Sequence, residues 1–237
     1  MKKEKMNKIS LLESKIKAVI FDMDGTIIDT EHVWQKVIYD FLAKRGITEL
    51  TEDQKVILKN TAGGGLPQAA SFFKQSFNFQ EPLEELIEEK VKMSVEYMQK
   101  YPINFINGFE NFHNILKKSR IPTSVGTNAS IPTLELLSQK LDFKKFFGSN
   151  IYSMEHVGRK AKPDPAVFLH AAEKLNVKPE ECLVFEDSIS GFSAAKKAGM
   201  TLVAIKNNQN KDILYHADFA IDDYTQADEI LKKVSKK

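Results

Sequence analysis

The stretch that most constrains the fold is a short apolar run that ends in two aspartates. Residues 18–21 read Ala-Val-Ile-Phe, carry no charge, and lead into Asp22, Met23, Asp24 and Gly25. An apolar run without polar alternation is typical of a strand buried on both faces, and such strands occur mainly inside parallel sheets. Side chains two positions apart on a strand point the same way, so Asp22 and Asp24 are expected to face one site beyond its carboxyl end.

Two carboxylates held this close repel each other, which raises the pKa of each unless a cation lies between them or one keeps its proton. This favours chemistry in which one carboxylate attacks as a nucleophile, its neighbour transfers a proton, and Mg²⁺ offsets the charge. Gly25 permits a sharp exit from the strand and lets backbone N–H groups approach an anion, and Thr26 adds a hydroxyl donor. Taken alone, Asp-x-Asp-Gly also suits a plain polar junction between a strand and a turn.

Four further strand patterns follow, with amphipathic helices between most of them. Strands that alternate with helices imply a parallel sheet covered by helices on both faces. We therefore predict an α/β fold, a Rossmann-like parallel sheet with an all-helical insert between its two halves. Residues 142–152, which hold several aromatic side chains, are predicted to be irregular. The strand patterns lie at 121–127, 182–185, 201–205 and 218–221, and the helices of the insert at 33–42, 53–60, 68–77 and 82–100.

Polar side chains follow three of the predicted strands. Ligands of a parallel α/β sheet bind beyond the carboxyl ends of its strands, so these groups are expected to meet. The second and third of these groups, taken alone, also suit the N-cap of the following helix, because threonine, asparagine and aspartate cap helices often. The three groups are Asp22 with Asp24, Thr127 with Asn128, and Glu186 with Asp187.

Composition excludes several classes of partner. The formal net charge of +2, from 34 basic and 32 acidic residues, provides no field that would attract nucleic acid or a membrane surface. Cys182 is the only cysteine, so no internal disulfide forms, and its apolar neighbours suggest a core residue. No apolar stretch approaches the roughly 20 residues that span a bilayer, and the basic start lacks the apolar region of a signal peptide. We expect a soluble cytoplasmic protein with no nucleic acid, membrane or obligate protein partner.

Four motifs in order carry a family resemblance. DMDGT, VGTNAS, AKPDP and FEDSISG, each placed at a strand end or in a loop beside one, resemble the four motifs of the haloacid dehalogenase superfamily. The helical insert after the first motif resembles the cap of its sugar-phosphate phosphatase and β-phosphoglucomutase group. This implies a catalytic core over 15–31 and 107–237 and a helical cap over 32–106, and the lysine-rich residues 1–14 before them are expected to be a basic tail. The expected substrate is a small phosphorylated metabolite.

The resemblance also implies roles for single residues. Asp22 is the expected nucleophile that becomes an aspartyl-phosphate, and Asp24 the expected acid and base that protonates the leaving alcohol and then activates water. Mg²⁺ is the expected cofactor. Its expected ligands are the Asp22 carboxylate, the Asp24 backbone carbonyl and the Asp187 carboxylate, with Glu186 placed nearby through water.

The phosphoryl group is expected to lie in a cradle of cationic and hydrogen-bonding groups. Lys162, rather than its neighbour Lys160, matches the lysine motif of the family and would bridge the nucleophile and the phosphoryl oxygens. Without the other motifs, Lys162 would be expected to be a solvated loop residue, as a lysine before proline usually is. The other expected contributors are Gly25, Thr26, the hydroxyl group of Thr127 and the backbone N–H of Asn128.

The resemblance leaves three reactions to weigh. Asp24 argues against dehalogenation, because the dehalogenases of this fold lack that aspartate. By the resemblance, a mutase would carry an arginine in the loop at 61–65, a histidine at position 34 and a lysine near position 130. This chain has no arginine in that loop, has tryptophan at position 34, and reads Ser-Ile-Pro from position 130. These departures favour a phosphatase over a β-phosphoglucomutase-like enzyme. A non-catalytic phosphate-binding module is disfavoured because all the motif residues are intact.

The insert is expected to select the substrate, although its sequence does not identify which one. Hexose, pentose, deoxy-sugar and glycerol phosphates and phosphoglycolate all stay open. Trp34 is expected to be a core residue of the cap, and Lys90 and Lys92 to be solvated. Residues 63–65, three glycines, suit a loop that approaches the ligand or a flexible turn.

Overall fold

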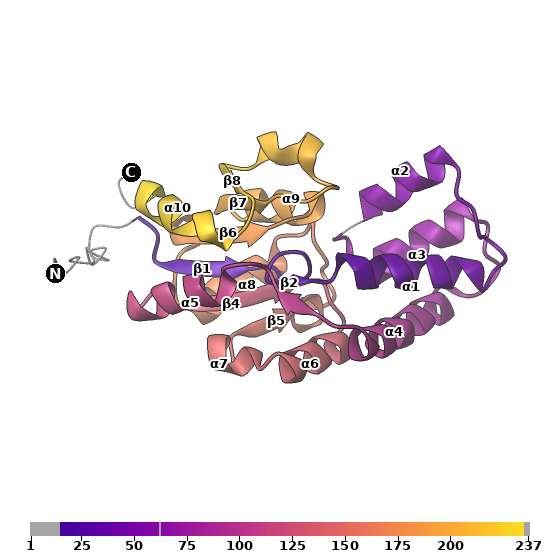
Figure 1. Cartoon of the computed structure of the whole chain (residues 1–237), viewed down its shortest axis with the longest axis horizontal. Coiled ribbons are helices and arrows are strands. Elements are labelled where there is room, and N and C mark those ends of the chain that lie inside the picture. The colour runs from indigo at the N-terminus through magenta and orange to yellow at the C-terminus, as the bar shows by residue number, and fades with distance from the viewer. Residues whose placement is uncertain (1–14, 62, 235–237) are drawn as a thin grey trace.

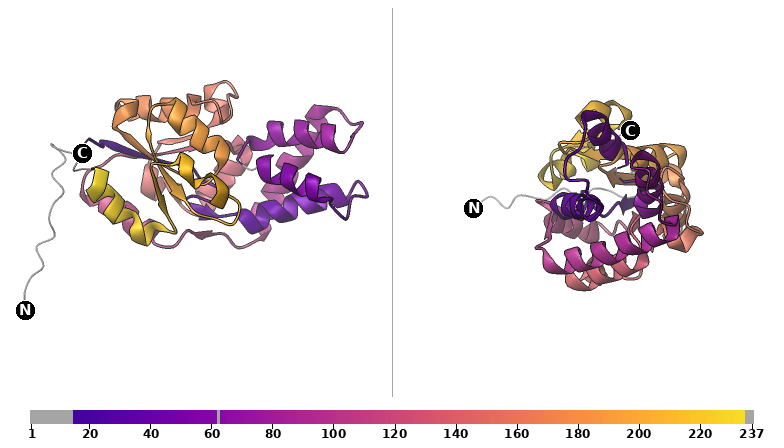
Figure 2. Two further views of the ribbon diagram at one scale, coloured as in Figure 1. Left: turned by 90° about the horizontal axis from the view of Figure 1, so that it is seen from above. Right: turned by 90° about the vertical axis from the view of Figure 1, so that its right-hand side faces the viewer.

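The computed structural model describes residues 15–61 and 63–234, which form a sheet-centred unit and a group of four helices beside it (Figure 1). The predicted basic tail lies outside the described residues. Figure 2 shows the four helices standing at one end of the sheet, beyond the tips of its strands. The strands are β1 (Ala18–Phe21), β2 (Ile28–Asp29), β3 (Asn104–Phe105), β4 (Thr123–Thr127), β5 (Ile151–Ser153), β6 (Cys182–Glu186), β7 (Thr201–Ile205) and β8 (Phe219–Ile221).

Ten α-helices are found in the described part of the chain. Four of them, α1 to α4, make up the insert, and six belong to the sheet-centred unit. They are α1 (Glu31–Ala43), α2 (Glu52–Thr61), α3 (Gly65–Ser76), α4 (Leu83–Lys100), α5 (Phe109–Lys118), α6 (Ile131–Lys140), α7 (Phe143–Phe147), α8 (Ala166–Lys174), α9 (Ile189–Lys197) and α10 (Ala227–Val234).

The main sheet has six parallel strands in the order β5-β4-β1-β6-β7-β8. β1 lies in the interior of the sheet, paired with β4 on one side and β6 on the other, and all four of its residues are fully buried. Its alternating side chains enter two separate cores, as the two-residue period of a strand requires. The predicted α/β fold with a parallel sheet and a helical insert is therefore confirmed.

The two faces of β1 pack against different helices. Val19 and Phe21 face a core shared with α5, α7 and α10, whereas Ala18 and Ile20 face a core shared with α8 and α9. Phe21 stacks on Phe185 of β6 with ring centroids 5.3 Å apart, and other aromatic rings surround it. This packing fixes the position from which the carboxyl end of β1 projects its polar residues.

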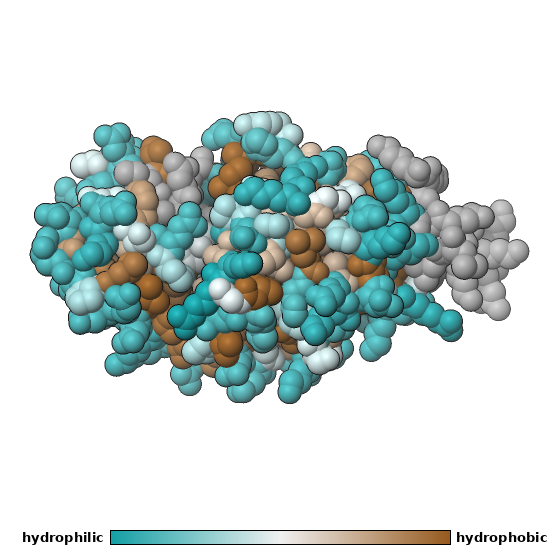
Figure 3. Space-filling view, turned by 180° about the vertical axis from the view of Figure 1, so that it is seen from behind, coloured by the Kyte–Doolittle hydropathy of each residue, from teal (hydrophilic) through white to brown (hydrophobic). Residues whose placement is uncertain are grey.

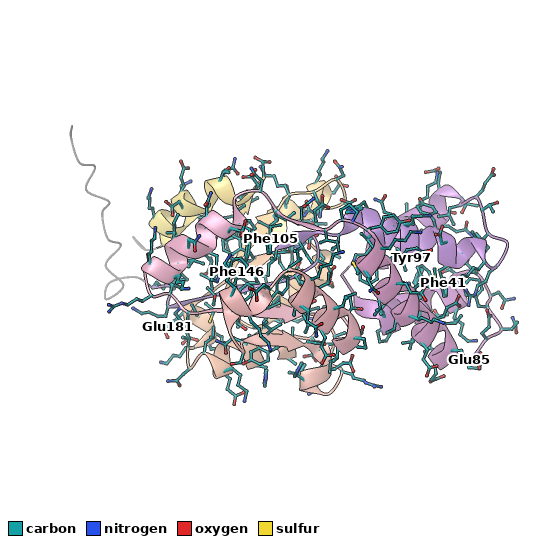
Figure 4. All side chains as sticks on the ribbon, turned by 60° about the horizontal axis from the view of Figure 1, so that its bottom comes forward. Phe41, Glu85, Tyr97, Phe105, Phe146 and Glu181 are labelled. Carbon is teal, nitrogen blue, oxygen red and sulfur yellow. The ribbon has the colours of Figure 1, made fainter. Side chains whose placement is uncertain are left out.

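Two short strands connect the helical insert to the sheet-centred unit. β2 and β3 pair antiparallel, with Ile28 opposite Phe105 and Asp29 opposite Asn104. Phe105 also packs against Phe146 of α7, with ring centroids 5.4 Å apart, whereas Phe41 and Tyr97 lie within the insert (Figure 4). The insert has its own apolar core, formed by α1, α3 and α4. The chain thus enters and leaves the insert through one narrow ribbon.

The structure corrects the prediction for residues 142–152. This segment contains the short helix α7 and the strand β5, so the sheet has six strands rather than the five that the sequence pattern indicated. β5 is an edge strand of three residues, too short for a period-2 pattern to stand out from its neighbours. The ribbon of β2 and β3 was missed for the same reason.

None of the helices in the described part of the chain is long and apolar enough to cross a bilayer. Seen from behind, the surface carries mainly hydrophilic residues with small hydrophobic groups between them (Figure 3). Cys182 is buried in β6 with a free thiol, in agreement with its expected place in the core.

Candidate active site

Asp22 follows β1 directly and lies at the centre of the candidate site. Its backbone N–H donates to the carbonyl of Phe185 at 3.0 Å, which ties it to β6, and its side chain is buried. Its Oδ1 atom accepts a hydrogen bond from Lys162 Nζ at 2.5 Å. Burial raises the pKa of the Asp22 carboxyl to about 7, and the Lys162 ammonium opposes this rise. A further cation beside Asp22 would favour its charged form in the same way.

Lys162 is the buried cation of the site. It is 1% exposed, and its ammonium also donates to Glu186 Oε1 at 3.0 Å. Burial lowers the pKa of Lys162, but the Asp22 and Glu186 carboxylates outweigh that effect and the net change is a rise. Lys160 is exposed, so of the two lysines in this loop Lys162 is the one that lies beside Asp22.

The side chain of Asn128 holds the loop that carries Lys162. Its Oδ1 atom accepts from the Lys162 backbone N–H at 2.9 Å, and its Nδ2 group donates to the Gly63 carbonyl at 2.8 Å. Sequence reasoning assigned only the backbone N–H of Asn128, so this side-chain contact was missed. Thr127 is also buried, and its hydroxyl oxygen accepts from the Ala129 N–H at 3.1 Å.

Asp24 receives two hydrogen bonds on one oxygen. The Thr30 hydroxyl donates to its Oδ1 atom at 2.7 Å, and the indole N–H of Trp34 donates to the same atom at 2.8 Å. Burial raises the pKa of Asp24, and these two hydrogen bonds oppose the rise. Oδ2 is left without a hydrogen-bond partner among the described residues, so it is the oxygen available to a ligand.

Trp34 is predicted to be a core residue of the cap, but it also donates a hydrogen bond to Asp24. It packs against the cores of both units, as a cap core residue would, but its N–H also reaches Asp24. Thr30 and Trp34 are four residues apart at the start of α1, and residues at that spacing lie on one face of a helix. Two hydrogen-bond donors at this spacing, close after Asp24, were the signal available in the sequence.

Asp22, Glu186 and Asp187 form an acidic cluster in which one ligand oxygen from each lies within 4.8 Å of the others. Burial raises the pKa of Asp187 well above its usual value, and the neighbouring Glu186 and Asp22 carboxylates raise it further. Carboxylates crowded in this way are stabilised by a cation, and such hard oxygen ligands suit Mg²⁺. The residues present thus fit the expected metal.

Glu186 already has partners on both of its carboxylate oxygens. Oε1 accepts from Lys162, and Oε2 accepts from the Ser188 backbone N–H at 2.6 Å and from the Ser188 hydroxyl at 3.0 Å. Fewer lone pairs are left for direct coordination than on Asp22 or Asp187. The placement of Glu186 beside the metal rather than directly on it stays a prediction.

Gly25 is needed where the chain leaves β1. Its φ of +74° lies in the left-handed region, and a Cβ at this position would collide with the Asp187 carboxylate. Thr26 is fully buried, and its hydroxyl donates to Asp187 Oδ1 at 3.2 Å. The turn after β1 therefore contacts the end of β6 directly, which the sequence did not suggest.

A cavity of about 720 Å³ extends from this cluster to the helical insert. Asp22, Asp24 and Asp187 line one part of it, and side chains of α1, α3 and α4 line another. The loop between α2 and α3 also touches the sheet-centred unit, because the Gly63 carbonyl accepts from Asn128. A Cβ at Gly63 would collide with Ser188. The glycine loop thus closely approaches residues at the ends of β4 and β6.

Lys90 of α4 lines this cavity and contradicts its prediction as a solvated residue. It is 2% exposed, and its ammonium lies 3.9 Å from the ring centroid of Phe73 and 5.4 Å from that of Phe41. Among the described residues, none forms an ion pair with it. Burial lowers the pKa of Lys90 to about 7. Lys92, two residues further along, is exposed as expected.

The chain is similar to known proteins in both sequence and structure. The family model of the haloacid dehalogenase-like hydrolases matches residues 16–199. A phosphorylated carbohydrates phosphatase of Thermotoga maritima is 32% identical over 78% of this chain and 82% of its own length. A fructose-1-phosphate phosphatase of Escherichia coli is 29% identical over 79% of this chain and 95% of its own length.

A solved structure of β-phosphoglucomutase from Clostridium difficile shares the fold, with a TM-score of 0.78 and 24% identity, over 93% of this chain and 97% of that one. The family model covers most of the chain, including the segments that carry all four motifs. The chain therefore belongs to the haloacid dehalogenase-like hydrolases, as its motifs predicted, and is an enzyme of that family.

Proposed function

We propose that the chain is a magnesium-dependent phosphatase that hydrolyses a small phosphorylated metabolite, a sugar phosphate, through an aspartyl-phosphate on Asp22. The observation that carries this proposal is the buried contact of Asp22 Oδ1 with Lys162 Nζ at 2.5 Å, inside an acidic cluster that opens into the cavity. The two similar phosphatases, which act on phosphorylated carbohydrates and on fructose 1-phosphate, support the substrate class.

In the first step, a carboxylate oxygen of Asp22 attacks the phosphorus atom. The bond from phosphorus to Asp22 forms, and the bond from phosphorus to the leaving oxygen breaks. Each pair of like charges at 4 Å opposes this attack by about 4 kcal/mol at an effective dielectric constant near 20. The Lys162 ammonium offsets part of that repulsion because it already contacts Asp22. Mg²⁺ held by Asp22, Asp187 and the Asp24 carbonyl would supply the remaining positive charge.

Asp24 moves the proton in both steps. Thr30 and Trp34 hold its Oδ1 atom, so Oδ2 gives the proton to the leaving alcohol. In the second step Oδ2 takes a proton from the water that attacks phosphorus. This attack breaks the bond to Asp22, releases inorganic phosphate and returns Asp24 to its protonated form. The pKa of Asp24, raised by burial, favours its protonated form at the start of the cycle.

We further propose that residues 32–106 act as a cap over a core formed by 15–31 and 107–237. The narrow ribbon of β2 and β3 provides a hinge between them. The cap would place the body of the substrate beside Lys90, which lines the cavity and has no carboxylate partner among the described residues. A buried amine in this position donates hydrogen bonds to hydroxyl groups or neutralises an anionic group on the leaving part. This supports a polar substrate rather than an apolar one.

The test is release of inorganic phosphate by the purified protein from a panel of phosphorylated metabolites. The panel contains hexose, pentose, deoxy-sugar and glycerol phosphates and phosphoglycolate, each assayed with Mg²⁺ and with EDTA. Metal-dependent release with a preference for a sugar phosphate is expected. Asp22→Asn is expected to abolish it, because the amide cannot attack phosphorus.

Lys162→Met and Lys160→Met form a matched pair from the same loop. Loss of turnover in the first and full activity in the second are expected, since only Lys162 contacts Asp22. Isomerisation of β-glucose 1-phosphate faster than phosphate release would replace this proposal with a mutase. Absence of metal-dependent turnover on every substrate, including p-nitrophenyl phosphate, would favour a non-catalytic binding module.

A further inference from the structure

The loop that follows β7 contacts the expected metal ligand Asp187 through two asparagines. Asn207 Nδ2 donates to Asp187 Oδ2 at 2.9 Å. Asn210 Nδ2 donates to the backbone carbonyl of Asp187 at 2.8 Å and to that of Ile205 at 2.7 Å. Asn210 is 2% exposed, so it links the ends of the neighbouring strands β6 and β7 from a buried position.

The loop fixes which way these two side-chain amides point. Asn207 Oδ1 accepts from the backbone N–H groups of Gln209 and Asn210, at 2.8 and 2.9 Å. Asn210 Oδ1 accepts from the Asn207 N–H at 3.0 Å. Since each side-chain oxygen is held by the loop itself, each NH₂ group is left to face Asp187. The network therefore presents donors, and not acceptors, to Asp187.

The Asp187 carboxylate is consequently held from two sides. Thr26 donates to Oδ1 from the turn after β1, and Asn207 donates to Oδ2 from the loop after β7. Each carboxylate oxygen can accept a second bond, so both stay available to a cation. The loop is anchored again at Gln209, whose side-chain amide donates to Glu31 of α1 at 2.9 Å.

We propose that Asn207 and Asn210 are positioning residues that orient Asp187 toward a divalent cation. This inference rests on the proposed function, because it assigns the cation of that site. Groups that hydrogen-bond to metal ligands fix their orientation, and losing one such group commonly weakens metal binding by about 10- to 100-fold. The two asparagines act through Asp187, to whose carboxylate and backbone carbonyl they donate.

The experiment is calorimetric titration of the full chain with Mg²⁺, together with its melting temperature in the absence of metal. The variants are Asn207→Ala and Asn210→Ala. Asn208→Ala is the matched control, because Asn208 lies in the same loop, is exposed, and makes no hydrogen bond found among the described residues. We expect each of the first two variants to bind Mg²⁺ at least tenfold more weakly than wild type, and Asn208→Ala to bind as wild type does.

The outcomes separate this inference from the proposed function. If wild type binds Mg²⁺ and Asn207→Ala binds it equally well, the positioning role is refuted while the phosphatase proposal stands. If wild type binds no Mg²⁺, the cation site fails and the inference fails with it. Asn207 is half-buried at the loop surface, so Asn207→Ala alone decides the question should Asn210→Ala fail to fold. A loss of affinity shared by Asn208→Ala would also refute the role.

Discussion

Replacing Lys90 by methionine is expected to stabilise the protein, most strongly at and below neutral pH. Lys90 is buried against Phe73 and Phe41, and burial lowers its pKa from 10.5 to about 7. That fall corresponds to about 5 kcal/mol of lost interaction for the ammonium. Cation–π attraction to the two rings stabilises the buried ammonium by about 0.5–2 kcal/mol and so offsets part of this loss. We therefore expect Lys90→Met to add about 3 kcal/mol to the free energy of unfolding at pH 7.

The direction of the pH dependence follows from the lowered pKa. Between pH 7 and pH 10.5, the unfolded chain binds a proton at Lys90 that the folded protein does not. The free energy of unfolding of wild type therefore rises with pH through this range, and below pH 7 the cost of the buried charge is fully present. The advantage of Lys90→Met over wild type should shrink by about 2–3 kcal/mol between pH 7 and pH 9.5.

Urea unfolding followed by circular dichroism at pH 7 and pH 9.5 measures both quantities. Lys92→Met is the matched control, because Lys92 lies on the same helix and is exposed. Its effect should be small and independent of pH. A gap between Lys90→Met and wild type that stays constant across this range would refute the reasoning, as would an equal effect of Lys92→Met.

Three further predictions concern the site and the core. Trp34→Phe should lower kcat on a sugar phosphate by about 10- to 100-fold, because it removes a hydrogen bond to Asp24 worth about 1.5–3 kcal/mol, and Trp34→His should restore part of the loss. The loss should be smaller with p-nitrophenyl phosphate, whose leaving group needs little protonation, and an equal loss on both substrates in steady-state assays would contradict this. Asp187→Asn should raise the urea midpoint of the metal-free protein at pH 7. The pKa of Asp187 is raised by folding, so the free energy of unfolding falls as pH rises from the unfolded-state pKa to the folded-state pKa, and the uncharged amide of the variant avoids this cost. The variant should also lack the stabilisation of about 2.7 kcal/mol that Mg²⁺ at 100 times its Kd gives wild type, and urea melts with and without Mg²⁺ check both points. Phe21→Ala should destabilise by about 3–5 kcal/mol in the same melts, because it empties a fully buried aromatic site, and a change below about 1 kcal/mol would contradict the packing described for β1.

The sheet was predictable because its central strands carry an unmistakable pattern. β1 and β6 are continuous apolar runs followed by acidic residues, so the sequence pattern predicts both the strands and the polar groups at their ends. β5 and the ribbon of β2 and β3 contain only two or three residues each. At that length, pairing with a neighbouring strand determines the structure, and that information is absent from a local pattern.

The candidate site was predictable at the level of residues but not of contacts. The motifs named the groups that line the site, and the structure brings Asp22, Lys162, Glu186 and Asp187 together. The roles of Trp34 and of the loop at 207–210 depend on contacts between segments far apart in the chain. Lys90 was misjudged because one lysine on a charged helix is usually solvated, and its burial depends on how α4 packs against α1 and α3.

The most direct test of the central claim is to detect the phosphoryl group on the protein. Asp24→Asn is expected to slow hydrolysis of the intermediate, because the amide cannot take a proton from water. Mass spectrometry of peptides from this variant, quenched during turnover with Mg²⁺ and p-nitrophenyl phosphate, whose leaving group needs little protonation, should show one added phosphoryl group on Asp22. A phosphoryl group on another residue, or full turnover in Asp22→Asn, would contradict the account.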